Sequence, residues 1–127
     1  AVTMTDTLHS GHINVLPDVS ADRTYTLPTP TGGGEVYRFI YGGSAADASN
    51  HIIKCPGTAV HFTGAVVHLD TDAGTAQEAT TIFANGSSHD TFQSNLTEML
   101  DITIVSSSTT NYFISGICAS TADAVIS

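Results

Sequence analysis

The side chains best suited to hold a metal ion in this 127-residue chain are its six histidines. His9 and His12 have the spacing of a metal-binding pair, but tight sites place such pairs on a helix or firm turn with further ligands nearby. His61 and His68 lie seven residues apart in one apolar run, so in a strand they point to opposite faces and do not share an ion. The histidine pattern therefore predicts no native metal site, and we expect no cofactor.

Two other stretches have part of a ligand-binding motif. Residues 70–74, Asp-Thr-Asp-Ala-Gly, start like a calcium loop, but the third acid is missing and Glu78 comes too early for the bidentate position. Asp and Gly together are typical of turns, which we take as the better interpretation. The glycines at 32–34 precede a strand and have no Lys-Ser/Thr after them, so they do not form a phosphate cradle.

Catalytic residue sets are equally incomplete. Ser44 follows two glycines but lacks the GxSxG elbow and an obvious His and Asp partner. The acids Glu35, Glu78 and Glu98 show no spacing that pairs them as a glycosidase would require. We therefore expect no enzymatic activity. The chain has two cysteines, Cys55 and Cys118, which we expect to be buried thiols rather than a disulfide.

The charge balance excludes further classes of function. Charged residues make up 12% of the chain, about half the usual share, and twelve acids face three bases for a net charge of -9. Nucleic-acid binding needs clustered Lys and Arg, so we expect none. No apolar run approaches the roughly 18 residues of a membrane helix, and the first residues lack the features of a signal peptide. We expect synthesis in the cytoplasm and no membrane partner.

The elements that must position any site are strands. Short runs rich in Val, Ile, Thr, Tyr and Phe alternate with clusters of Gly, Pro, Asn, Asp and Ser. We predict strands over 13–16, 23–27, 35–41, 51–54, 60–69, 79–84, 99–105 and 112–119. This spacing predicts an all-β fold, a compact antiparallel β-sandwich or barrel. At this length residues 13–127 form one domain, and a helix, if present, is a single turn near 94–99.

Alternation within the strands predicts which side chains are buried. In 35–41, Tyr37, Phe39 and Tyr41 share one face, toward the core or a subunit interface, and Arg38 lies on the other. Residues 112–119 are apolar on both faces, which indicates a strand that is central or buried between subunits. We therefore expect self-association, with Tyr112, Ile114 and Ile117 at the subunit interface.

Residues 1–12 are polar and β-prone, with few apolar side chains to pack. We predict that they form an extended N-terminal arm that orders on a partner or on a neighbouring copy by strand addition, the alternative being a frayed terminus. The residues expected to bind that partner are Val2, Met4, Leu8, His9 and His12.

Five segments, read in order, carry a resemblance to a known group of proteins. They are RTYTLP at 23–28, YRFI at 37–40, NHIIK at 50–54, GAVVHLDTD at 64–72 and NYFISG at 111–116. Together they resemble small β-rich structural proteins of tailed bacteriophages, over about residues 13–119. Related chains often carry Trp where Tyr112 stands here.

The resemblance implies a capsid decoration, or cement, protein. Such a protein is a homotrimer on the outer surface of the virion head, where it bridges subunits of the major capsid protein. A trimeric tail-fibre or receptor-binding head that recognises a host glycan fits the composition equally well, and copy number separates the two. A secreted carbohydrate-binding module is less suitable because the chain has no Trp for ring stacking.

Overall fold

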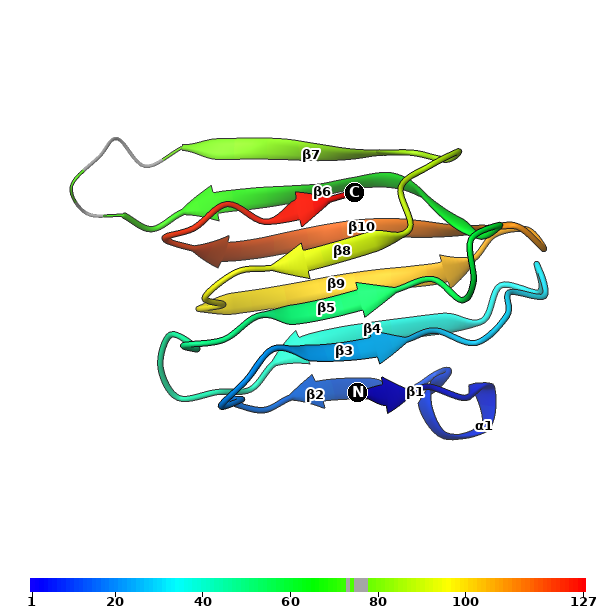
Figure 1. Cartoon of the computed structure of the whole chain (residues 1–127), viewed down its shortest axis with the longest axis horizontal. Coiled ribbons are helices and arrows are strands. Elements are labelled where there is room, and N and C mark those ends of the chain that lie inside the picture. Colours follow the sequence, from blue (N-terminus) through cyan, green and yellow to red (C-terminus); the bar gives the residue numbers. More distant parts are fainter. Residues whose placement is uncertain (73, 75–77) are drawn as a thin grey trace.

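The chain forms two mixed β-sheets packed together, and its described residues include a short helix (Figure 1). The computed structural model describes residues 1–72, 74 and 78–127. The elements are β1 (Val2–Thr3), α1 (Asp6–His9), β2 (Ile13–Leu16), β3 (Arg23–Thr26), β4 (Val36–Tyr41), β5 (His51–Lys54), β6 (His61–Asp70), β7 (Ala79–Asn85), β8 (Thr91–Ser94), β9 (Met99–Ser106), β10 (Asn111–Ser120) and β11 (Val125–Ile126). The all-β prediction is confirmed. Within the described residues no helix is long and apolar enough to cross a membrane.

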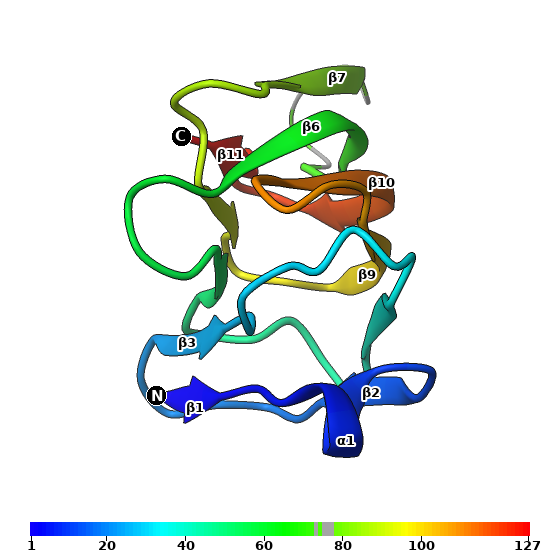
Figure 2. The same ribbon diagram turned by 90° about the vertical axis from the view of Figure 1, so that its right-hand side faces the viewer.

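The smaller sheet has the order β1-β3-β5-β8-β11 and the larger sheet the order β2-β4-β9-β10-β6-β7. Figure 2 shows β1 beside β2 at one end of the two layers, and β7 with β11 at the other. From β2 to β5 the chain alternates between the sheets, so β2 and β4 pair in parallel, as do β3 and β5. The purely antiparallel prediction is therefore wrong, because a chain that crosses to the other layer and returns re-enters in the same direction.

The core lies between the two sheets, and the predicted faces are correct. Tyr37 and Phe39 are fully buried and Tyr41 nearly so, while Arg38 points away from the core. Ile102 and Ile104 of β9 alternate in the same way. Side chains on a strand alternate with period two, which is why the sequence pattern alone assigned these faces.

The N-terminal residues are not a separate extended arm. β1 pairs in parallel with β3, and the Met4 amide donates to the carbonyl of Thr26 at 2.8 Å. Met4 is only 2% exposed and belongs to the core, and Thr5 caps α1 by accepting from the Leu8 amide. The structure does not confirm a separate arm, because the Met4 side chain belongs to the core and Val2 packs against it.

The predicted helical turn near 94–99 is also wrong. Ser94 ends β8 and Met99 begins β9, and Leu96 between them has a positive φ of 47°. The side chains of Ser94 and Thr97 are buried and hydrogen-bond to each other at 2.6 Å. This local bond satisfies a tight reversal without a helical turn.

Candidate functional site

One cluster has the residue types of a hydrolase site. His68 Nε2 lies 3.0 Å from Ser120 Oγ, and His68 Nδ1 lies 3.6 Å from Asp123 Oδ1. A nucleophile, a base and an acid that orients the base follow this order in serine hydrolases. The three residues come from β6, the end of β10 and the turn after it, so no local sequence motif identifies them.

The Ser120 and His68 side chains are buried, which gives this cluster a structural role rather than a catalytic one. Ser120 and His68 are each about 1% exposed, so a substrate cannot reach the hydroxyl. The Ser120 hydroxyl donates its proton to the carbonyl of Ala122 at 2.6 Å, so toward His68 Nε2 it acts as the acceptor. A general base at Nε2 would need the opposite direction of donation. The cluster therefore fastens the turn that leads into β11.

A second buried cluster surrounds His51. His51 Nε2 donates to Asp47 Oδ2 at 2.9 Å, and the Tyr25 hydroxyl lies 3.4 Å from Nδ1. Asp47 also accepts from the amides of Val19 and Ser49. Burial lowers the pKa of His51, which favours the neutral ring that these bonds describe. The cluster ties two loops to β5 and leaves no group facing solvent for chemistry.

The other candidates from the sequence have structural contacts. The described residues contain no group of three side chains placed to hold a metal ion. Asp70 accepts from the Asp72 amide at 2.8 Å and Asp72 from the Gly74 amide at 2.9 Å, which is turn geometry; Ala73 lies outside the described residues. Cys55 and Cys118 are buried and unpaired, and burial raises their pKa to about 12 and about 11, so both remain thiols.

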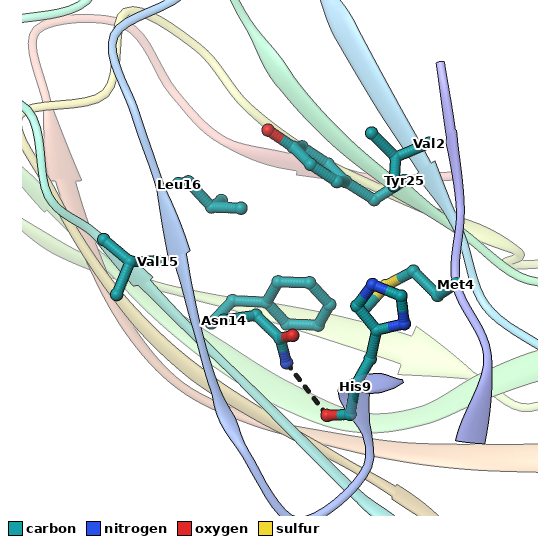
Figure 3. Close-up of a pocket in the computed structure, with 8 residues that line it drawn as sticks. Val2, Met4, His9, Asn14, Val15, Leu16 and Tyr25 are labelled. Carbon is teal, nitrogen blue, oxygen red and sulfur yellow. Dashed lines mark hydrogen bonds between the residues drawn. The ribbon is translucent and has the colours of Figure 1, made fainter. Parts of the chain in front are cut away.

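A pocket of about 220 Å³ lies between β1 and β2 (Figure 3). Its lining is mostly apolar: Val2, Met4, His9, Asn14, Val15, Leu16, Tyr25 and Phe39. The Asn14 amide nitrogen holds the wall by donating to the carbonyls of His9 and Arg38. The volume is below that of most ligand sites, which start near 300 Å³, so the pocket suits one side chain.

The pocket brings together three of the five predicted partner-binding residues, Val2, Met4 and His9. Leu8 on α1 and His12 after it are both exposed and do not line it. The predicted subunit-interface residues are separated in a similar way. Tyr112 and Ile114 are fully buried in the chain's own core, so that role is wrong for them, whereas Ile117 is half-buried on the opposite face of β10.

The larger sheet exposes an apolar outer face, the face turned away from the smaller sheet. Five large apolar side chains are exposed on it: Phe83 (70%), Val15 (62%), Ile13 (55%), Phe113 (45%) and Val36 (37%). Strand alternation places each of them opposite the core. Sequence reasoning missed this face because the strands are apolar on both sides and the pattern does not say which side is covered.

An apolar row crosses β10, β9 and β4 on this outer face, near the end of β9 and the starts of β4 and β10. Phe113 of β10 is opposite Val105 of β9, and Val105 is opposite Val36 of β4. The ion pair between Arg38 and Asp101 crosses the same face with two bonds, at 3.0 and 2.8 Å, and Arg38 lowers the pKa of Asp101. Because the two charges cancel, this part of the face has no net charge beside the apolar row, which is compatible with a protein-docking surface.

Comparisons with known protein families, with curated proteins and with solved structures found no match.

Proposed function

We propose that this chain is a non-enzymatic virion structural protein that decorates the outer surface of a bacteriophage head and stabilises it by bridging major capsid subunits. The observation that carries the proposal is the apolar row of Phe113, Val105 and Val36 on the outer face of the larger sheet. The row supports a protein-docking surface. The resemblance to phage structural proteins supplies the identity of the partner.

The physical properties of the row suit a bracing role. Fully burying a Phe or Val side chain contributes about 1.5–3 kcal/mol, so covering the exposed parts of Phe113 (45%) and Val36 (37%) is worth about 1–2.5 kcal/mol per copy. In the larger sheet β10, β9 and β4 each have a neighbouring strand on both sides, so docking orders little backbone. Modest affinity repeated over many lattice positions stabilises a shell without any single strong contact.

The test uses heads assembled from the major capsid protein of the same virus and lacking this chain. We expect Phe113→Asp to weaken binding at least tenfold, because it removes apolar contact and places a charge in the interface. Thr24→Asp, on the outward side of β3 in the smaller sheet, is the matched control and should bind as the unmodified chain does. Equal occupancy of the heads by Phe113→Asp and the unmodified chain, with the fold intact, would refute docking through this row.

A further inference from the structure

The two ends of the larger sheet are open edges formed by β2 and β7. These strands run in opposite directions. β2 is parallel to β4, β4 antiparallel to β9, β9 antiparallel to β10, β10 parallel to β6, and β6 antiparallel to β7. A second copy rotated about an axis parallel to the strands would therefore present its β7 antiparallel to β2.

At its open edge, the backbone of β2 has N–H and C=O groups that do not bond to β4. The carbonyl of Leu16 points toward β4, because it accepts from the Gly42 amide at 2.9 Å. Successive residues of a strand direct their N–H and C=O groups to alternate sides. The groups of Ile13 and Val15 therefore point to the open edge, and the side chains of both lie on the outer face.

The edge of β7 has the same arrangement. The Gly86 amide donates to the carbonyl of Phe62 in β6 at 2.9 Å, so the even-numbered residues of β7 face β6. Thr81 and Phe83 then direct their N–H and C=O groups to the open edge. Their side chains lie on the outer face, as those of Ile13 and Val15 do, so antiparallel pairing matches both the hydrogen bonds and the side-chain faces.

Neither edge strand contains a charged residue or a proline, two of the devices by which edge strands avoid association. β2 reads INVL, with Pro17 directly after it, and β7 reads ATTIFAN. Copies with a net charge of -9 repel one another, so they approach best where the contact surfaces are uncharged. Phe83, Val15 and Ile13 are also the three most exposed large apolar side chains of the outer face.

We propose that β7 of one copy adds to β2 of the next copy as an antiparallel strand, so that the larger sheets of neighbouring copies become continuous. In this contact Phe83 of one copy packs against Ile13 and Val15 of the other. The edge N–H and C=O groups of β7 and β2 hydrogen-bond to each other. It is head-to-tail, and a repeated head-to-tail contact closes into a ring when the rotation from copy to copy divides a full turn, and otherwise extends as a filament. A ring of three is the homotrimer that the resemblance predicts. The contact itself does not depend on the capsid role.

The smaller sheet favours the head-to-tail arrangement over a symmetric pairing of two β7 strands. β11, the edge strand beside β7, exposes Val125, and the pocket lined by Val2 and Met4 opens beside β2 at the opposite end. Head-to-tail contact brings the Val125 end of one copy against the pocket end of the next. Symmetric β7 pairing would leave β2, its exposed side chains and the pocket uncovered.

Crosslinking of variants with one added cysteine tests the contact in the purified chain, without heads. Val15→Cys and Phe83→Cys are mixed and treated with a short bismaleimide; native Cys55 and Cys118 are each 1% exposed and do not react. We expect a covalent dimer from the mixture, none from either variant alone, and a covalent trimer from the double variant. Thr103→Cys, central on the same face, is the control partner for Phe83→Cys and should give no product.

Two results would overturn the proposal: no product from the mixture, or a dimer from Phe83→Cys alone, which means symmetric β7 pairing. A charge exchange provides a second readout. Phe83→Lys should reduce the sedimenting mass to that of one chain, and adding Val15→Glu to the same chain should restore the larger mass. An unchanged mass for Phe83→Lys would also contradict the contact. Because neither experiment involves heads, its failure leaves the Phe113 docking test standing on its own.

Discussion

Replacing Met4 by alanine tests whether the N-terminal segment is an integral part of the fold. Met4 is 2% exposed and packs in the core between the two sheets. Met→Ala in a core costs about 2–5 kcal/mol, and the cost rises with the cavity that remains. Met4 already borders the 220 Å³ pocket, so part of its surroundings is open and we expect the lower part of that range, about 2–3 kcal/mol.

The assay is urea unfolding followed by far-ultraviolet circular dichroism, with thermal unfolding as a second measurement. For a chain of this size a loss of about 2–3 kcal/mol lowers Tm by about 10 °C. Leu8→Ala is the matched control, because Leu8 is 71% exposed four residues away and should change stability by no more than about 0.5 kcal/mol. A Met4→Ala variant as stable as the Leu8→Ala variant would show that the segment does not pack on the domain.

Three further predictions follow from the described contacts. Gly116→Ala should reduce the free energy of unfolding by more than about 2 kcal/mol, because at a φ of 135° the new Cβ would lie 2.3 Å from the Asp101 carbonyl oxygen. Gly11→Ala is the control, since its new Cβ meets open space, and it should cost about 1 kcal/mol. Equal losses of stability in urea unfolding would contradict this prediction. Burial lowers the pKa of His51 in the folded chain, so as the pH falls the unfolded chain takes up the proton first. The stability of the fold should therefore be full above about pH 6.5 and decline below it, and the decline should be shallower in His51→Gln. Parallel pH profiles of Tm for the two chains would contradict the assignment. Ser120→Ala should lose about 1–3 kcal/mol, and a fluorophosphonate probe should leave the unmodified chain unlabelled; labelling at Ser120 would show a reactive hydroxyl.

The strands and their faces were predictable where alternation is strong. Residues 51–54 and 13–16 match β5 and β2, and the buried faces of 35–41 and 99–105 are correct, because one side of each strand must be apolar to meet the core. The strands β1, β8 and β11 were missed, because β1 and β11 have only two residues each and β8, TFQS, has a single large apolar side chain. Strand direction was missed because it depends on which layer each connection reaches, and that is a long-range property.

The candidate site was only partly predictable. The sequence pointed to Val2, Met4 and His9 as binding residues, and they do share a pocket, but Met4 does so from within the core. The exposure of Phe83 and Phe113 depends on which sheet face lacks a covering layer, and local pattern does not contain that information. The approach of His68 to Ser120 joins positions 52 residues apart through the parallel pairing of β6 and β10.

Counting the copies of this chain that bind an undecorated head tests the proposed function most directly. Purified chain is added to such heads until binding saturates, and the ratio of this chain to the major capsid protein is measured on a stained gel and located by electron microscopy. We expect hundreds of copies per head, in groups of three on the outer surface. Absence from the head, or a handful of copies confined to the tail as expected of a receptor-binding fibre, would contradict the decoration role.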